Sequence, residues 1–139
     1  MKEIDIPAEK ENLSQVIAFV DRQLERAGCP MSIQTQIELA VEEIFMNIAS
    51  YAYDSSVGSV MIKVDIIDKS LDIVISFTDN GVPYDPLSHT APSIKTPPRE
   101  RTKGGWGIFM AKKMMDNMQY EFKNSQNILT IRKSWNTVP

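Results

Sequence analysis

The sequence predicts an α/β protein of the α+β kind, a two-layer sandwich in which helices cover one face of a mostly antiparallel sheet. Segments 59–67 and 71–78 alternate apolar and polar residues and are joined by a short polar turn, which is typical of a hairpin. Segments 12–27 and 33–53 instead repeat apolar residues at helical spacing. Runs of antiparallel strands, with helices able to cover one face, favour this architecture.

The first half of the chain gives one strand, two helices and the hairpin. Segment 2–7 alternates and ends at Pro7, which predicts a short edge strand. The first helix ends at the break "AGCPMS", where Ser32 is expected to cap the second helix. The central apolar stripe of that second helix consists of Ile37, Val41, Ile44 and Ile48.

The second half begins with a long polar segment, about 82–104, that shows no regular pattern. A helix from there to about Met118 and a second hairpin with strands at 120–123 and 128–134 complete the chain. The expected order is therefore β-α-α-β-β-loop-α-β-β, with residues 1–139 forming a single domain.

Composition narrows the class of function. The chain has 139 residues and a net charge of −3, which argues against a surface that binds nucleic acid directly. Cys29 is the only cysteine, so neither a disulfide framework nor a cysteine zinc site is expected. Because no leader-like or membrane-spanning apolar stretch is present, we expect a cytoplasmic protein without a membrane partner.

Helix 33–53 carries a Glu–Asn pair on a surface that is otherwise largely apolar. Glu43 and Asn47 lie about 40° apart on the helical wheel, one turn from each other. A helix that is apolar nearly all round is expected to be buried, so the pair needs partners. Either both side chains reach solvent through a gap, or they face a cleft where they hold a metal ion or steer a proton.

The segment "DNGVPYDP" follows the third predicted strand. Asp-Asn-Gly taken alone is a strong signal for a hairpin turn. Pro83 and Pro86 cannot donate to a ladder, and no alternating strand returns, so the chain leaves the sheet here. Asp79 is then a carboxylate at a strand end, suited to accept a hydrogen bond from an exocyclic amine, and Gly81 allows a ligand to approach closely.

The long polar segment resembles a lid or binding loop, because structureless loops of this length are uncommon in compact domains. It ends in Arg99, Arg101 and Lys103, directly before the glycine-rich stretch "GGWGIF". The cations alone are explained as a solubilising charge run, and the glycines alone as a hinge. Together they predict an anion site, because N–H groups at the start of a helix favour negative charge.

The glycine stretch differs from two familiar phosphate-binding motifs. No Gly-Lys-Ser/Thr follows it, as a Walker A loop requires. Met110 stands where a dinucleotide fingerprint has its last glycine, and a loop rather than a strand precedes the stretch.

The three segments "EEIFMNIASYAY" (42–53), "DNGVPYDP" (79–86) and "GGWGIFMAKKMMD" (104–116) follow one another in this order. The set resembles the N, G1 and G2 boxes of the GHKL ATPases, a group that includes gyrase, heat-shock chaperone, histidine kinase and mismatch-repair ATPases. Their spacing and the short chain look most like the stand-alone anti-sigma-factor serine/threonine kinases. The resemblance spans about residues 8–134 and implies the Bergerat ATP-binding fold.

The resemblance also implies roles for individual residues. Asn47 matches the asparagine that binds Mg²⁺ between the nucleotide phosphates, and Glu43 matches the carboxylate proposed as general base. Asp79 matches the aspartate that binds the adenine amine, and Gly81 matches the glycine that lets the base approach. Thr130 resembles the threonine that completes the adenine pocket.

Gly105 and Gly107 match the backbone that contacts the phosphates, and we expect at least one of Arg101, Lys103 and Arg99 to reach the γ-phosphate. The chain departs from the family pattern at three aromatic positions. Tyr51 stands where histidine is frequent, Tyr84 where phenylalanine is common, and Trp106 where a smaller apolar residue is usual. None of these departures removes a ligand.

The function implied by the resemblance is that of an ATP- and Mg²⁺-dependent serine/threonine protein kinase. Such a kinase acts as an anti-sigma factor, and it phosphorylates a small antagonist protein that competes with a sigma factor. One alternative is a non-catalytic ATP-binding module that sequesters a protein partner, and another is a plain α/β domain without a nucleotide. The edge strand at 2–7 permits a homodimer without requiring one.

Overall fold

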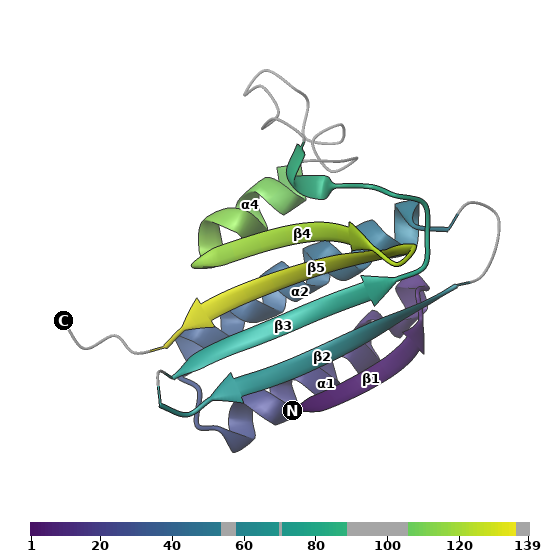
Figure 1. Ribbon diagram of the computed structural model, residues 1–139. Helices are drawn as coiled ribbons and strands as arrows, with labels where there is room; N and C mark the ends of the chain where they lie inside the picture. The colour runs from purple at the N-terminus through teal and green to yellow at the C-terminus, as the bar shows by residue number, and fades with distance from the viewer. Residues whose placement is uncertain (54–57, 70, 89–105, 136–139) are drawn as a thin grey trace.

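The computed structural model of the protein describes residues 1–53, 58–69, 71–88 and 106–135. Within this part of the chain, five strands form one sheet in the order β1-β2-β3-β5-β4, and every neighbouring pair is antiparallel (Figure 1). The predicted fold class is confirmed. The strands are β1 (Lys2–Pro7), β2 (Ser59–Ile67), β3 (Asp72–Asp79), β4 (Asn117–Lys123) and β5 (Gln126–Ser134).

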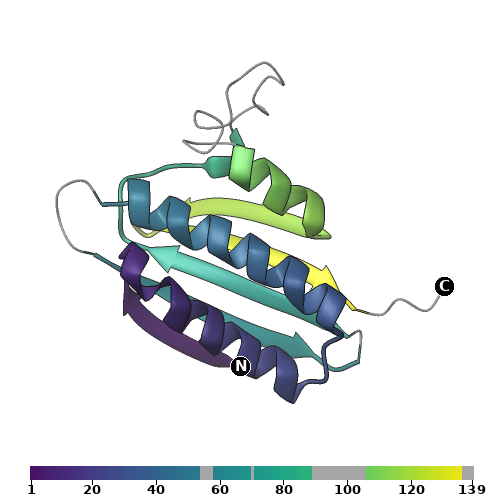
Figure 2. The same cartoon turned by 180° about the vertical axis from the view of Figure 1, so that it is seen from behind.

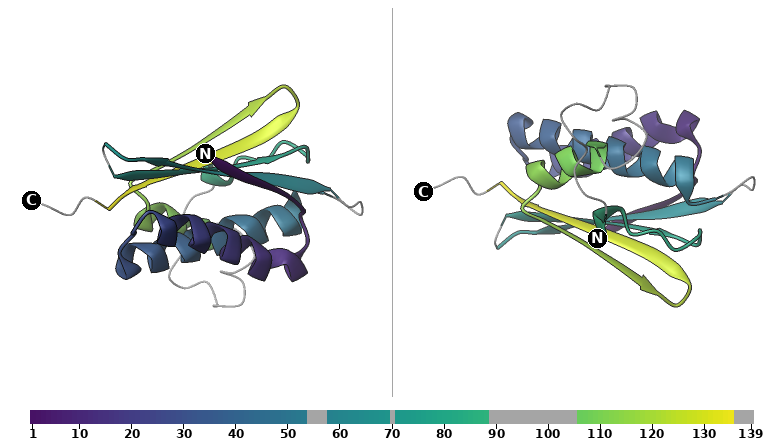
Figure 3. Two further views of the ribbon diagram at one scale, coloured as in Figure 1. Left: turned by 90° about the horizontal axis from the view of Figure 1, so that it is seen from below. Right: turned by 90° about the horizontal axis from the view of Figure 1, so that it is seen from above.

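The helices gather on one face of this sheet, as Figure 2 shows from behind and Figure 3 shows edge-on. Helix α2 (Met31–Tyr51) crosses the middle, α1 (Leu13–Arg26) lies on the side of β1 and β2, and α4 (Trp106–Met114) lies on the side of β4 and β5. Two 3-10 turns complete the described elements, η1 (Lys10–Asn12) and η2 (Pro86–Ser88). The molecule therefore has a helical layer and a sheet layer.

The core lies between these two layers and follows the alternation of the strands. The register places Ile62 opposite Phe77 and Phe77 opposite Leu129, so one buried row runs across the sheet beneath the helices. The predicted stripe of α2 is buried there. The expectation that α2 is buried nearly all round is wrong, because Leu39 is 45% exposed on its outer surface. Among the described residues, α2 is covered on the side toward the sheet and on its flanks toward α1 and α4.

Three predicted boundaries shift for local reasons. Helix α2 begins at Met31, directly after the extended Pro30 (ψ 145°), so Ser32 lies inside the helix rather than capping it. Helix α4 ends at Met114, and Met118 is a buried residue of β4. Strand β5 begins at Gln126 rather than at 128, because Asn124 and Ser125 both adopt positive φ (54° and 61°) and form a tight turn after β4.

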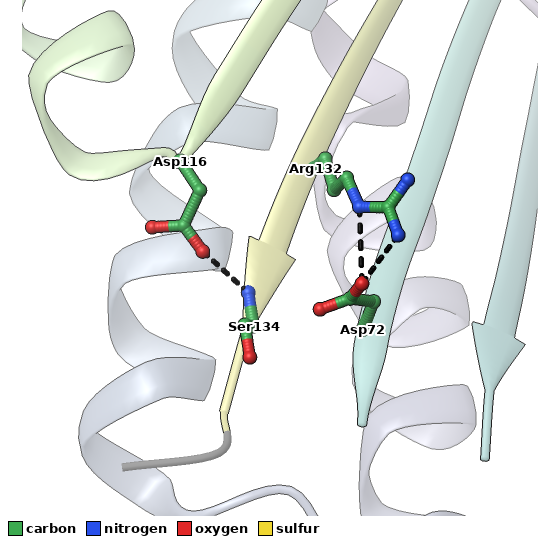
Figure 4. Close-up of polar contacts among 4 residues, drawn as sticks. All are labelled: Asp72, Asp116, Arg132 and Ser134. Atoms are coloured by element: carbon green, nitrogen blue, oxygen red, sulfur yellow. Dashed lines mark hydrogen bonds and ion pairs between the residues drawn. The ribbon is translucent and has the colours of Figure 1, made fainter. Parts of the chain in front are cut away.

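Polar contacts fix the end of α4 to the sheet (Figure 4). The Asp116 carboxylate accepts a hydrogen bond from the Ser134 N–H (2.7 Å). The Lys133 ammonium donates to the Met114 carbonyl (2.8 Å). Beside them, Arg132 of β5 forms an ion pair with Asp72 at the start of β3. These contacts hold α4 at its carboxyl end, so its amino end is held at the opposite end of β3 and β5.

A pair of carboxyl groups on neighbouring helices should make stability depend on pH. A hydrogen bond with Asp21, followed by partial burial and the charges of Asp21 and Glu25, raises the pKa of Glu38 from 4.5 to about 7. A carboxyl whose pKa is higher in the folded state stabilises the fold below its unfolded pKa. That contribution is lost as pH rises through about 7.

We therefore expect Glu38→Gln to flatten the pH dependence of stability between pH 4.5 and 7. At alkaline pH the variant should be more stable than wild type by up to about 1 kcal/mol, since solvent screening limits the effect of a pair that is only partly buried. Urea unfolding at pH 5 and pH 8 measures it. Glu9→Gln, at an exposed position before α1, is the control. Equal pH slopes for all three proteins would contradict the role of the pair.

Candidate functional site

A narrow pocket opens where β3 and α2 both end. Its walls are mostly apolar and come from α2, β3, β5, the segment after β3 and the start of α4. The polar groups that line it are the side chains of Asn47, Asp79 and Asn127 and the tyrosines Tyr51, Tyr84 and Tyr120. Three predicted site segments, on α2, at the end of β3 and on α4, therefore meet at one cavity.

Asp79 supplies the buried carboxylate of this pocket. It is the last residue of β3 and is only 4% exposed. Its Oδ1 accepts hydrogen bonds from the Gly81 N–H (2.8 Å) and from the Asn127 amide (2.9 Å). A carboxylate is stable at such depth only with partners of this kind. These two hydrogen bonds fix the position of the carboxylate, which can act as a hydrogen-bond acceptor for a ligand.

Asn127 of β5 connects the floor of the pocket to the chain that follows β3. Its Nδ2 donates to Asp79 and to the Val82 carbonyl (2.9 Å). Its Oδ1 accepts the Tyr84 N–H (3.1 Å) and the Tyr120 hydroxyl. The Asn127 side chain is thus fully occupied, and it fixes the path of the segment that leaves the sheet.

The expectation that Thr130 completes the pocket is wrong. Side chains of a strand alternate between faces, and Asn127, Leu129 and Ile131 point to the helical layer. Thr130 therefore lies on the opposite face of the sheet, beside Gln119 of β4. The residue that β5 contributes beside Asp79 is Asn127, which is in phase with the buried Leu129 and Ile131. That phase was readable from the sequence.

Gly81 is required by contact with the protein itself. A Cβ at this position would lie 2.1 Å from the Ala52 carbonyl oxygen, just beyond the end of α2. The Val82 N–H donates to the same oxygen (2.9 Å). Tyr53 adds a second contact, because its hydroxyl accepts a hydrogen bond from the Asn80 N–H (2.9 Å) and donates one to the Ser59 carbonyl (2.6 Å). The turn after β3 is thus held against the end of α2.

We expect Gly81→Ala to destabilise the fold by about 1–3 kcal/mol, because a backbone oxygen cannot move aside as a flexible side chain can. Denaturant unfolding measures the loss. Asn80→Ala, at the exposed neighbouring position, is the control and should have a small effect. Equal midpoints for the two variants would show that the contact with Ala52 is not tight.

Asn47 lies on the wall of the pocket, one helical turn after Glu43 on α2. Burial raises the pKa of Tyr84, and a hydrogen bond with the Asn47 side chain offsets part of that rise. The Tyr84 ring stacks on Tyr51, with ring centroids 5.9 Å apart and planes inclined by 24°. Two of the three aromatic residues that depart from the family pattern, Tyr51 and Tyr84, therefore touch each other and border Asn47.

Glu43 lies at the amino end of α4, in contact with Gly107. A Cβ on Gly107 would sit 1.9 Å from the Glu43 Oε2, so the absence of a side chain makes room for the carboxylate. Burial and the nearby charge of Glu42 raise the pKa of Glu43. Glu43 is nevertheless exposed. Its carboxylate therefore reaches solvent beside the first turn of α4, and of the Glu–Asn pair Asn47 is the one that lines the pocket.

Four predicted site residues, Arg99, Arg101, Lys103 and Gly105, lie outside the described residues. Residues 82–88 of the predicted lid segment are described, and they include η2 and line the pocket through Val82, Tyr84 and Pro86. This part of the segment is therefore a wall of the site.

The arrangement suits a flat heteroaromatic ring that carries an amine. An apolar slot with one buried acceptor at its floor selects a planar group with a donor. The polar side chains Asn47 and Glu43 lie on the α2 side, with Gly107 beside Glu43. An anionic part of the same ligand is favoured at the amino end of α4.

The profile of the histidine kinase-like ATPase domain family matches residues 6–133. The chain belongs to this family. The match includes each described element that forms the pocket, from α2 to β5. No curated protein sequence is similar enough to be matched to this chain.

Solved structures show the same fold at low sequence identity. The RsbU and RsbW domains of Rv1364c from Mycobacterium tuberculosis align with a TM-score of 0.66 at 15% identity, over 96% of this chain and 32% of that one. The SiaB-SiaC complex from Pseudomonas aeruginosa gives 0.58 at 13% identity, over 96% and 89%. The catalytic domain of histidine kinase ThkA gives 0.56 at 11% identity, over 97% and 98%. This ATPase domain therefore spans about a third of the first of these chains.

The residues of the domain fit Mg·ATP. The described part of the chain has no group of three or more His, Cys, Asp or Glu side chains that could hold a metal ion by themselves. Magnesium commonly takes one or two protein oxygens and completes its shell with substrate phosphates and water, so the single amide oxygen of Asn47 is a fitting donor. Among the helices described, none has the length and apolarity needed to cross a membrane.

Proposed function

We propose that this domain is an ATP-dependent serine/threonine protein kinase that acts as an anti-sigma factor in a bacterial partner-switching system. Its substrate is a small anti-sigma-factor antagonist protein. The proposal has two parts, a nucleotide site and a phosphoryl transfer, and they depend on different residues.

The observation that carries the transfer is the position of Glu43. Its carboxylate lies against Gly107 at the amino end of α4, one turn from Asn47 and away from the buried Asp79. A module that only bound ATP would have no use for a second carboxylate beside the phosphate end of the site. The raised pKa of Glu43 also brings its basicity closer to that of an effective general base.

The proposed chemistry follows from these positions. Asp79 accepts the adenine amine, and the apolar walls hold the ring. Asn47 would hold Mg²⁺, which would neutralise charge on the phosphates. Glu43 takes the proton of a serine or threonine hydroxyl as its oxygen bonds to the γ-phosphorus. The bond from that phosphorus to the β,γ-bridging oxygen breaks, and ADP leaves.

The partner follows from the motif resemblance and from the exposure of Glu43. A general base that is reachable from solvent suits a hydroxyl presented by another protein. SiaB, which shares the fold, was crystallised with SiaC, and this supports a protein partner. Phosphorylation of the antagonist would release it and leave the kinase free to bind a sigma factor in the cytoplasm. The open edge of β1 offers a surface for a homodimer.

The test combines calorimetry with a transfer assay. Purified protein is titrated with ATP, with and without Mg²⁺, and is then incubated with γ-labelled ATP and antagonist proteins encoded beside its gene. We expect binding and label on a serine or threonine of one antagonist, and none with Glu43→Gln. If ATP binds but no antagonist is labelled, the non-catalytic binding module replaces the kinase. If no nucleotide binds, both are wrong.

A further inference from the structure

We propose that Asn127 is a positioning residue that relays a fixed hydrogen-bond polarity from the segment after β3 to Asp79, so that the pocket selects a ring carrying an amine. This inference rests on the proposed nucleotide site. It assigns a role in ligand selection to a side chain that the phosphoryl transfer itself does not use.

Backbone partners fix which end of the Asn127 amide points in which direction. The Val82 carbonyl can only accept a hydrogen bond, and its oxygen lies 2.9 Å from Asn127 Nδ2. The Tyr84 N–H can only donate, and its nitrogen lies 3.1 Å from Asn127 Oδ1. Reversing the amide would set its oxygen against the carbonyl and its NH₂ group against the N–H. The orientation of Asn127 therefore follows from groups whose polarity cannot change.

The oriented amide then determines what Asp79 meets. Asn127 Nδ2 donates to Asp79 Oδ1 (2.9 Å), and the Gly81 N–H donates to the same oxygen (2.8 Å). Both donors are neutral, and Asp79 is only 4% exposed, so each donor contributes substantially to keeping the carboxylate ionised and in place. Because both donors meet Oδ1, the second carboxylate oxygen is the one left for a ligand in the pocket that Asp79 lines.

Tyr120 holds the same amide from the side of β4. Its hydroxyl donates to Asn127 Oδ1, the oxygen that also accepts the Tyr84 N–H. Asn127 is 6% exposed and lies opposite Asp79 in the register of β3 and β5. Strands β4 and β5 and the segment after β3 therefore hold one amide against one carboxylate.

A site of fixed polarity discriminates by what the ring carries at one position. An amine donates to the carboxylate, a hydrogen atom leaves the buried acceptor without a partner, and a carbonyl oxygen faces its negative charge. Sites built to hydrogen-bond a ligand group reject analogues that lack this group, because buried polar atoms are then left unpaired. ATP, purine riboside triphosphate (hydrogen in place of the amine) and inosine triphosphate (carbonyl in its place) therefore report the polarity at Asp79.

Calorimetry with these three nucleotides and Mg²⁺ gives the preference as a ratio of affinities. We expect wild type to bind ATP about tenfold or more tightly than the purine analogue. Asn127→Leu keeps the approximate shape of the side chain and removes its hydrogen bonds, so this ratio should fall below about threefold, whatever happens to ATP affinity itself. A residue that only stabilised the fold would weaken the binding of all three nucleotides equally.

Thr130→Val is the matched control. Thr130 lies on the same strand as Asn127 but on the opposite face of the sheet, beside Gln119. The variant should keep the wild-type ratio of affinities.

Asp79→Asn tests the same polarity if Asn127→Leu fails to fold. Because Asn127 and the Gly81 N–H hold an oxygen at the Oδ1 position, the amide of this variant must turn its NH₂ group toward the pocket. The order of preference should therefore reverse, and inosine triphosphate should bind this variant more tightly than ATP does.

Two results overturn the inference and leave the nucleotide site in place. One is a folded Asn127→Leu variant that keeps the wild-type ratio, and the other is an Asp79→Asn variant that still prefers ATP to inosine triphosphate. If wild type binds ATP and the purine analogue equally, neither Asp79 nor Asn127 selects the ligand. Failure of wild type to bind any of the three nucleotides refutes the proposed nucleotide site as well.

Discussion

Asp79→Asn should abolish useful nucleotide binding, with a loss in ATP affinity of about 100-fold. A hydrogen bond to a charged group contributes about 1.5–3 kcal/mol, and that range converts to roughly 10–150-fold. The Gly81 N–H and the Asn127 amide both donate to Asp79 Oδ1, so the asparagine keeps its oxygen at that position and turns its NH₂ group toward the pocket. The variant therefore loses the acceptor for the adenine amine. Calorimetry with Mg·ATP measures the effect.

Asp72→Asn is the matched control for that experiment. Asp72 is also a buried aspartate of β3, 8% exposed, but it lies at the other end of the strand and pairs with Arg132 (Figure 4). Its loss should lower stability without changing ATP affinity. The two variants thus separate a binding defect from general damage to the sheet. Equal affinity for Asp79→Asn and wild type would remove Asp79 from the site.

The fold could be predicted because its periodic signals are strong. Alternation in β2 and β3 and the stripe on α2 specified which side chains meet, and the register places them together. The order of elements followed from the same patterns. Boundaries were less certain where a helix runs into a strand, as at Met118, because an apolar side chain suits both.

The site was predictable only where a residue type is tied to a motif. As the motif order implied, Asp79 and Asn47 line one cavity, and Gly107 contacts the Glu43 carboxylate beside that cavity. Asn127 was missed because the predicted strand began at residue 128, although Asn127 lies within β5 and is in phase with Leu129 and Ile131. Its importance comes from contacts with residues more than forty positions earlier in the chain, at Asp79 and Val82.

Gly81 shows a different limit of sequence reasoning. The glycine was expected to admit the ligand, and the structure shows that it admits the end of α2. Room for a ligand and room for the end of α2 are needed at the same place, because the contact between Gly81 and Ala52 forms part of the pocket wall. A motif can therefore mark a residue correctly while the physical reason lies in packing.

Glu43→Gln should reduce phosphoryl transfer by about 10²–10⁴-fold, the usual contribution of a general base. Glutamine keeps the shape of the side chain against Gly107 but cannot take the proton. ATP affinity should stay within a few-fold of wild type, because the adenine and Mg²⁺ contacts are assigned to Asp79 and Asn47. Single-turnover transfer to the antagonist, measured beside calorimetry, gives both values. Equal loss of binding and transfer would show that Glu43 holds the nucleotide instead.

The pH profile provides an independent check on the same carboxylate. A base acts only when deprotonated, so transfer should rise with pH through the pKa of Glu43, which burial and the charge of Glu42 raise above 4.5. Glu42→Gln removes the smaller of these two causes, because burial is unchanged. The acidic limb of the pH–rate profile of this variant should therefore move to lower pH, and the rate on the plateau should stay the same. A limb that stays in place in Glu42→Gln, or that persists in Glu43→Gln, would assign the titration to another group.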